Sequence, residues 1–406
     1  MAAAYNLGMS SVLPSGRLAG LGDAAFAAHP AQEAIEVCVH GAGAVGASLA
    51  LALSRRGIAV ALVDASLSRL PSAPPREDLR AYALNGTSVQ LLKSLRVWDA
   101  LPADARTPVM EMAVVGDAGG AIGFTAWQQA VTELAWIVDA AALDQVLAEA
   151  LRYAPHVHRV EAPVAAPLQA ICEGRASSTR AALGVAFDAQ PYHHVALAAR
   201  LVSDLPHQGV ARQWFQSPGV LGLLPFDRPQ RGHGWALVWS LPTDEAQRWL
   251  DADAADFEAA LNEATGGAAG RLTLASARAG WTLISGRAEH CSGDGWVLLG
   301  DAAHAMHPLA GQGLNLGLAD VASLAPRLAD ARARRPWRSL GDARTLREYA
   351  RERAAPTLAM SGLVDGLWQL FSRDEAAFKE LRNQGMSLVD HLPPLKRWLT
   401  RQALQG

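Results

Sequence analysis

The pattern of apolar and polar positions in residues 35–63 is that of a strand, a helix and a second strand. Residues 35–39 form a short apolar run rich in β-branched side chains, which predicts a strand. Residues 47–54 are rich in Ala and Leu and predict a helix, which ends in the basic turn Arg55-Arg56-Gly57. Residues 58–63 predict the second strand. The chain therefore begins its folded part with a βαβ unit.

The pattern changes further along the chain. Apolar residues at helical spacing predict helices over residues 83–95, 139–151, 251–263, 317–330 and 342–382. Short apolar runs separated by glycine and proline predict strands within residues 106–134, 185–242 and 296–299. The order of segments is thus α/β, then β, then α/β again, then α.

Glycines lie between the first strand and helix at positions 41, 43 and 46. Gly41 permits the tight turn, Gly43 removes a side chain where a pyrophosphate would pass, and Gly46 lets the helix pack close to the strand. The helix N-terminus offers free N–H groups to phosphate. Asp64 ends the second strand, where a carboxylate accepts hydrogen bonds from ribose hydroxyls. The segment predicts a dinucleotide site without separating FAD from NAD, and its alternative is an ordinary buried βαβ unit.

A second glycine-rich segment spans residues 300–317, directly after the apolar run 296–299. Gly300 and Asp301 then lie at the carboxyl edge of a strand, where ligands bind in open α/β sheets, and Asp301 is suited to ribityl hydroxyls. Glycines further along let the backbone lie close to a flat ring, and N–H groups at the next helix N-terminus stabilise negative charge on a reduced flavin. The residues expected at the ring are Pro308, Gly311, Gln312, Gly313, Leu314 and Asn315. Together the two segments predict one FAD.

Composition and charge exclude several other functions. The chain has 406 residues and a net charge of −3, without a basic stripe with interleaved aromatics, so no nucleic-acid partner is predicted. Three widely spaced cysteines fit no zinc or disulfide pattern, which predicts a reducing cytoplasm. His304 and His307 are three apart, but Pro308 and Gly311 break the helix that would align them, so no metal site is predicted.

Four stretches resemble motifs of the class A flavoprotein aromatic hydroxylases, especially the ubiquinone-biosynthesis hydroxylases. They are residues 41–46, 78–85, 300–317 and 392–396, and the stretch 207–215 also resembles the ubiquinone subgroup. The resemblance covers residues 35–404. It implies that the glycines at 41, 43 and 46 and Asp64 hold the adenosine half of FAD, that Arg80 contacts its pyrophosphate, and that Asp301 binds the ribityl chain. It also implies that Pro308 and residues 311–315 line the isoalloxazine.

The sequence departs from the family pattern at several places. Glu173-Gly174 stands where the family has a central Asp-Gly serving both FAD and NAD(P)H. The stretch 155–172 before it is shorter than usual. Trp281-Thr282-Leu283 replaces an aromatic-Pro-Leu turn, and Val138-Asp139 lacks the usual Arg, Asn or Gln. Glu173 and Gly174 remain in the expected FAD site, and these departures put NAD(P)H binding in question.

The predicted fold class is α/β, with a discontinuous Rossmann-like FAD-binding domain, an inserted and mostly antiparallel β-sheet substrate domain, and a C-terminal helical region. Residues 35–105, 135–184 and 275–330 are assigned to the FAD-binding domain, and residues 106–134 and 185–274 to the substrate domain. Residues 331–406 form the C-terminal helices. Residues 1–34 lack the basic start and apolar core of a secretory signal, so they are either a poorly ordered extension or the product of an overlong predicted start.

The resemblance implies an FAD-dependent monooxygenase with NADH or NADPH as a transient co-substrate and O2 as oxidant. The substrate expected is an aromatic, polyprenylated phenol of ubiquinone biosynthesis. Two alternatives stay open: a catalytically impaired flavoprotein with a structural role in a biosynthetic complex, and a hydroxylase of a soluble aromatic acid. The sequence identifies no catalytic base; Tyr192, His193 and His194 are candidates only because they titrate or form hydrogen bonds.

The C-terminal segment 392–406 has two interpretations. Leu395, Trp398 and Leu399 share one face of a helix flanked by basic residues, which suits a bilayer surface. The alternative is packing on the protein itself or on a partner. With no transmembrane helix evident, the predicted location is cytoplasmic, with peripheral contact at the inner face of the membrane as one interpretation.

Overall fold

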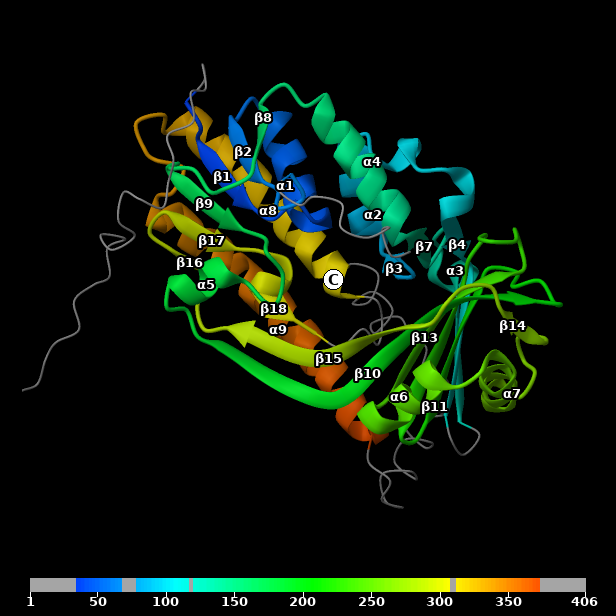
Figure 1. Cartoon of the computed structure of the whole chain (residues 1–406). Coiled ribbons are helices and arrows are strands. Elements are labelled where there is room, and N and C mark those ends of the chain that lie inside the picture. The colour runs from blue at the N-terminus through cyan, green and yellow to red at the C-terminus, as the bar shows by residue number, and fades with distance from the viewer. Residues whose placement is uncertain (1–33, 68–77, 117–119, 307–311, 373–406) are drawn as a thin grey trace, which may run out of the picture.

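The computed structural model describes residues 34–67, 78–116, 120–306 and 312–372. Figure 1 shows the parallel sheet and its helices gathered at one side of the molecule, and the largest sheet with its own helices at the other. The predictions for residues 1–33 and for the C-terminal segment lie outside the described residues.

The first sheet has six strands in the order β16-β17-β9-β1-β2-β8. Their bounds are β1 Val37–His40, β2 Val60–Val63, β8 Val157–Val160, β9 Leu168–Ile171, β16 Ser292–Gly293 and β17 Trp296–Leu298. All neighbouring pairs are parallel except β16 with β17. The helices α1 Ala44–Ser54, α4 Ala140–Arg152 and α8 Gln312–Arg334 pack together beside it. Because β17 joins β9 from a distant part of the chain, this layer is discontinuous in sequence, as predicted.

The largest sheet follows the order β18-β15-β10-β13-β12-β11-β5-β6, with β14 paired to β10. Its strands are β5 Glu111–Gly116, β6 Ala121–Thr125, β10 Phe187–Ser203, β11 Val210–Gln216, β12 Gly219–Pro225, β13 Gly234–Pro242, β14 Leu272–Leu274, β15 Ala279–Ala288 and β18 His304–Ala305. All its pairs are antiparallel except β11 with β5. The helices α6 Thr243–Asp251 and α7 Ala254–Thr265 bury one face, where Phe257 and Leu261 pack against Trp239 and Leu237. These two sheets confirm the predicted fold class.

A small third sheet lies between the two layers, in the order β3-β7-β4. Its strands are β3 Ala81–Leu84, β4 Arg106–Val109 and β7 Ala135–Asp139. The remaining helices are α2 Gly86–Ser94, α3 Ala126–Gln129, α5 Ser178–Ala182 and α9 Ala343–Ser372, and short 3-10 turns cover Trp98–Ala100, Ala103–Ala105 and Gly300–Ala302.

Several helix predictions were wrong in their bounds; the helix expected over 317–330, for example, runs from Gln312 to Arg334. The helix expected over residues 83–95 begins only at Gly86, because residues 81–84 pair with β7 and Asn85 caps α2 by accepting a hydrogen bond from the Ser88 N–H at 2.9 Å. The acidic helix expected over 251–263 corresponds to α7, which begins at Ala254 and ends at Thr265, while Asp251 is the last residue of the preceding helix α6. Asp253 caps α7 by accepting from the Asp256 N–H at 2.8 Å, which starts a new helix there.

The described residues carry neither a membrane span nor a metal centre. None of the helices in these ranges combines the length and apolar character needed to cross a bilayer. The same ranges contain no group of three or more His, Cys, Asp or Glu side chains able to hold a metal ion. Cys38, Cys172 and Cys291 are free, and burial raises the pKa of Cys38 and Cys291 to about 11.

Candidate active site

A cavity of about 520 Å³ lies between the parallel layer and the largest sheet. One side is formed by the two glycine-rich segments and Arg80, through Gly43, Ala44, Val45, Gly174, Gly300, Asp301, Gly313 and Leu314. The other side is mostly apolar and comes from the sheets, through Val109, Met112, Ile137, Ala196, Ala198, Ala211, Val220, Leu224, Val238 and Trp281. The fold thus brings together segments that are more than 200 residues apart in the sequence.

The turn between β1 and α1 is built on glycine for three different reasons. Gly41 has a φ of +99°, and a Cβ there would lie 2.7 Å from the Cys172 carbonyl oxygen. A Cβ at Gly46 would lie 1.9 Å from the Gly41 oxygen, so no side chain fits between strand and helix. A Cβ at Gly43 would meet nothing within 4 Å, because Gly43 faces the cavity. Close packing requires the outer two glycines, and the middle one leaves space on the cavity side.

The N-terminus of α1 points its free donors at this space. Gly43 is the N-cap and no side chain accepts from the first turn, which also contains no acidic residue. Unsatisfied N–H groups and the positive end of the helix dipole favour an anion there.

The second glycine-rich segment forms the adjacent wall. Gly300 has a φ of +58° and leads into Asp301, which is exposed along the cavity. Burial by the surrounding protein raises the pKa of Asp301, against the lowering effect of His304, Arg175 and Arg80. Gly313 and Leu314, in the first turn of α8, line the same wall. Pro308 and Gly311 lie outside the described residues, and Gln312 is described only as the first residue of α8.

Arg80 supplies positive charge to the cavity. Its guanidinium donates to both carboxylate oxygens of Asp78, from Nε at 2.9 Å and from Nη2 at 2.6 Å. This bonding raises the pKa of Arg80. Arg80 is therefore held charged on the wall of the cavity, and its contact with the pyrophosphate stays a prediction.

Asp64 and Glu173 end or follow strands at this edge, but their carboxylates have partners within the protein. Asp64 accepts from Arg159 and, at 2.6 Å, from the Ser66 hydroxyl. Glu173 accepts from Ser177 Oγ at 2.6 Å and from the Thr179 N–H at 3.0 Å. Neither carboxylate lines the cavity, whereas Gly174 does. Among the hydrogen bonds of the described residues, Asp64 therefore has one acceptor site left, on Oδ2, for a further hydrogen bond.

The comparisons with known proteins agree with this geometry. A model of the FAD binding domain family matches residues 34–158 and 144–360. The chain belongs to this family. It is 30% identical to ubiquinone hydroxylase UbiL of Rhodospirillum rubrum, over 92% of this chain and 90% of the relative. It is 28% identical to 3-demethoxyubiquinol 3-hydroxylase of Escherichia coli K12, over 91% of this chain and 98% of the relative.

Solved structures support the same fold. The crystal structure of p-nitrophenol 4-monooxygenase PnpA from Pseudomonas putida DLL-E4 superposes with a TM-score of 0.71 at 18% identity, covering 92% of this chain and 99% of that chain. The protein is thus an FAD-dependent monooxygenase of the aromatic hydroxylase class, which confirms the family and the cofactor predicted from the sequence.

The residues present fit FAD. Gly43 leaves space where a side chain would otherwise fill the cavity, α1 offers uncapped donors beside it, and Arg80 adds a cation. Further along the cavity, Asp301 offers acceptors and the first turn of α8 offers backbone donors. The hydroxylase therefore offers one cation and helix N–H groups to the phosphates, and a wall that contains Gly300 and Gly313 beside them.

A buried hydrogen-bond network around Asp320 lies behind this wall and was not predicted from the sequence. Asp320, which is 1% exposed, accepts from the Gly300 N–H at 3.0 Å and from His304 Nε2 at 2.8 Å. Its other oxygen accepts from Arg353 Nε at 2.8 Å. Burial alone would raise the pKa of Asp320, but His304, Arg353 and the Gly300 N–H lower it overall. The only sequence signal was one acidic residue among apolar neighbours in a predicted helix.

Asn315 also has a role that the sequence did not indicate. Its side chain is buried, and Oδ1 accepts from the Asn85 N–H at 3.0 Å and from Ser88 Oγ at 2.7 Å. Its Nδ2 donates to the Ala83 carbonyl at 2.8 Å. These bonds connect the first turn of α8 to the β3–α2 connection, and so hold the second glycine-rich segment against the segment that follows Arg80.

None of the candidate bases lines the cavity. Tyr192 donates its hydroxyl to Asp365, and both ring nitrogens of His194 lie within 3.0 Å of backbone carbonyls. His193 has a φ of +55° and its carbonyl accepts from Thr243. All three residues lie at the irregular part of β10, between Pro191 and Val195, and their side chains do not line the cavity.

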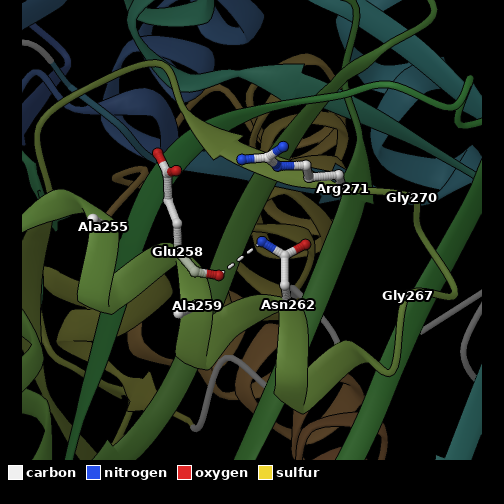
Figure 2. Close-up of a pocket in the computed structure, with 7 residues that line it drawn as sticks. All are labelled: Ala255, Glu258, Ala259, Asn262, Gly267, Gly270 and Arg271. Atoms are coloured by element: carbon white, nitrogen blue, oxygen red, sulfur yellow. Dashed lines mark hydrogen bonds between the residues drawn. The ribbon is translucent and has the colours of Figure 1, made fainter.

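A separate hollow of about 580 Å³ lies beside α7 (Figure 2). There Asn262 donates to the Glu258 carbonyl at 2.7 Å, and the Glu258 carboxylate accepts from the Leu274 N–H at 2.7 Å. These side chains hold α7 to β14. They have no connection to the cavity that carries the glycine segments.

The Glu173 carboxylate makes stability depend on pH. We expect Glu173→Gln to lower the free energy of unfolding by about 1–3 kcal/mol at pH 7, because charged acceptors form the stronger hydrogen bonds. Although burial alone would raise the pKa of Glu173, bonds from Ser177 and Thr179 and the nearby His40 lower it overall. The contribution is therefore complete above the unfolded pKa of about 4.3 and is lost as pH falls through the folded pKa.

Denaturant unfolding of both proteins from pH 7 to pH 3 measures this difference. The gap between them should shrink below about pH 4.3. Glu149→Gln is the matched control, because Glu149 pairs with the exposed Arg152 and should change stability little. A gap that stays constant to pH 3 would mean that Glu173 does not act as a charged acceptor.

Proposed function

We propose that the protein uses FAD, NADH or NADPH, and O2 to hydroxylate the aromatic ring of a ubiquinone precursor that carries a polyprenyl tail. The observation that carries this proposal is one cavity with the glycine turn before α1 and the second glycine-rich segment on one side, and a mostly apolar sheet face on the other. The names of the two relatives, which cover nearly the whole chain, support the substrate class.

For the cofactor we assign the glycines at 41, 43 and 46, Arg80 and Gly174 to the dinucleotide half. We assign Gly300, Asp301, Pro308 and residues 311–315 to the ribityl chain and ring, with Asp64 and Glu173 acting near the ribose and at the adjoining loop. When bound, FAD supplies the activation of O2 for insertion of one oxygen atom into the ring. The chain itself supplies phosphate-binding donors, a cation and backbone N–H groups.

On the substrate side, the chain positions the ring and excludes water. The strand register places Ala196, Ala211 and Val238 on the face that lines the cavity, and two polar side chains, Gln213 and Ser240, lie on the same face. Apolar walls exclude water from the reacting ring. We propose that Gln213 and Ser240 hydrogen-bond the ring oxygen and so set which carbon faces the cofactor.

The direct test starts from purified protein. It should show a flavin spectrum and oxidise NAD(P)H faster when a polyprenylated phenol is added. A colourless protein that FAD cannot reconstitute would falsify the proposal. A yellow protein that NAD(P)H never reduces would favour the structural role, which is suggested by the hydrogen bonds of Glu173 within the protein. If only soluble aromatic acids increase the rate of NAD(P)H oxidation, the substrate is a soluble aromatic acid.

Filling the sheet side should block the substrate without affecting FAD. A Cβ at Gly222 would meet only the Val238 oxygen, at 3.5 Å, so Gly222→Leu directs its side chain into the cavity. We expect phenol-stimulated NAD(P)H oxidation to fall by about tenfold or more, since lost ring binding of about 1.4 kcal/mol has that effect, while flavin content stays unchanged. Stopped assays of product formation measure the loss.

The matched control is Gly123→Leu in β6. Gly123 pairs with Ala113, which alternates with the cavity-lining Met112 and therefore lies on the opposite face. A Cβ at Gly123 meets nothing within 4 Å, so the fold has room for the added side chain. Equal losses in both variants would show that general damage to the sheet, not the cavity, causes the effect.

We also propose that residues 392–406 contact a bilayer surface, which would place the enzyme at the inner face of the membrane near a polyprenylated substrate. Their apolar face with flanking basic residues supports this. Deleting residues 392–406 should reduce co-sedimentation with anionic liposomes, measured by the bound fraction. Unchanged binding would favour instead packing on the protein or on a partner in a biosynthetic complex.

A further inference from the structure

A second cavity, of about 660 Å³, lies between α9 and the segment that joins β15 to β16. Its wall includes Leu298, Ala303 and His304, whereas Gly300, Asp301 and Met306 line the active-site cavity. The two cavities share none of their lining residues. The two cavities therefore contact different residues of the segment 298–306, and of the two only the second is lined by α9.

Three arginines line this cavity without an acidic partner. Arg287, Arg347 and Arg351 form no ion pair with any carboxylate in the described ranges, and all three are exposed. Neighbouring arginines behave differently: Arg344 pairs with Glu348 at 3.3 Å, and Arg353 pairs with Asp320. Like charges gathered without counter-charge repel one another, so an anion placed among them would be stabilised.

The acidic residues of the lining do not supply this counter-charge. Glu289 lies 3.7 Å from the ring of His290, and both are exposed at the rim. Asp320 is buried and already accepts from Gly300, His304 and Arg353. The lining thus carries an excess of positive charge in a chain whose net charge is −3.

Two buried polar atoms of the lining residues also lack partners. Thr357 is 7% exposed and its Oγ1 forms no hydrogen bond within the described part of the chain. His304 is 5% exposed, and its Nδ1 is likewise without a partner there. Each of these atoms exposes less than 1 Å² of surface, so both lie behind the cavity wall and not on it. The groups of the lining that can meet an anion are therefore the three arginines.

The rest of the lining is apolar. Ala288, Leu298, Ala303 and Ala350 form the inner wall, and Leu358 lies at the rim with 50% of its surface exposed. A bare inorganic ion would leave this surface without contacts. A ligand with an apolar body and one anionic group would satisfy both parts of the lining.

We propose that this cavity is a binding site for a small organic oxyanion, a carboxylate or phosphate ester with an apolar body, held by Arg287, Arg347 and Arg351. Guanidinium groups bind carboxylate and phosphate oxygens in pairs of parallel hydrogen bonds, which suits arginine better than lysine for this task. The site is separate from the cofactor cavity and does not depend on which ring the enzyme hydroxylates.

The test uses the full-length holoenzyme and isothermal titration calorimetry at fixed ionic strength. Phenyl phosphate, benzoate and inorganic phosphate are the probes. We expect saturable binding of phenyl phosphate or benzoate, with inorganic phosphate weaker. The stronger of the two organic probes identifies the headgroup chemistry. The proposal is overturned if none of the probes shows saturable binding. This holds also where the cause is another segment of the chain that fills the cavity.

Variants assign the binding to this cavity. The double variant Arg347→Gln/Arg351→Gln should weaken the organic probes by about tenfold or more, since each charged hydrogen bond contributes about 1.5–3 kcal/mol. Arg344→Gln, on the same helix but paired with Glu348, should bind the probes as the wild type does. Flavin content checks that both variants are folded. Probe affinity that is unchanged in the double variant places the binding elsewhere, for example in the active site, and also overturns the proposal.

Discussion

Replacing Gly43 with valine should abolish FAD binding while leaving the protein folded. A Cβ at this position meets no protein atom within 4 Å, so the fold has room for it. The added side chain lies on the cavity side of the turn, next to the uncapped first turn of α1. It would occupy the space that a pyrophosphate needs and separate the phosphate from the helix donors. We expect FAD affinity to fall by about a hundredfold or more, equivalent to about 2.7 kcal/mol.

Fluorescence titration of the apoprotein with FAD measures this loss, and circular dichroism checks the fold. Gly362→Val in α9 is the control, because a Cβ there also meets nothing within 4 Å and the position is exposed away from the cavity. If Gly43→Val retained wild-type FAD affinity, the turn would not be the phosphate site and the assignment of its glycines would fail.

Replacing Asp320 with asparagine should have the largest effect on stability. The asparagine side chain is similar in size, but its neutral amide could not balance the charge of its two partners, the buried His304 and the partly buried Arg353. Removing one member of a buried ionic cluster costs about 3–5 kcal/mol, because the remaining charge is left without compensation. The Gly300 N–H would also lose a charged acceptor, which should loosen the turn that carries Asp301.

Thermal unfolding of the apoprotein and FAD titration together separate two roles for Asp320. A purely structural role lowers the melting temperature alone. A positioning role for Gly300 and Asp301 also weakens FAD binding, at temperatures where the variant is folded. Asp330→Asn on the same helix is the control, since Asp330 pairs at the surface with Arg334 and should change neither quantity. Equal melting temperatures for Asp320→Asn and the wild type would contradict the stabilising role of the network.

The sequence predicted the local parts of this site better than the contacts between them. The strand–glycine–helix segment around residues 37–54 was predicted because its periodicity and its glycines are local properties. The bonds of Asn315 to Asn85 and Ser88 join positions 227–230 residues apart, and spacing along the chain carries no information about them. The same holds for the contacts of Asp320 with Arg353.

The hydrogen bonds of Asp64 show a second reason why the sequence did not predict contacts between elements. Asp64 was placed correctly at the end of β2, because strand ends follow from hydrophobic runs. Its partner Arg159 comes from the neighbouring β8, whose register is fixed by the whole sheet. Likewise, residues 83 and 84 were predicted as the start of a helix but belong to strand β3, because pairing with β7 outweighs a weak local preference.

The position of β17 has a consequence for how the protein must be made. β1, β2, β8 and β9 are complete once residue 171 has been synthesised, yet β9 remains an open sheet edge until β17, residues 296–298, pairs with it. An unpaired edge strand promotes association with other chains. While more than 120 further residues are synthesised, the edge of β9 in the nascent chain is therefore unpaired. Any protein product that ends before residue 296 keeps this unpaired edge. Fragments intended to contain only the N-terminal half should aggregate, and the earliest fragment with a finished parallel layer must extend beyond β17.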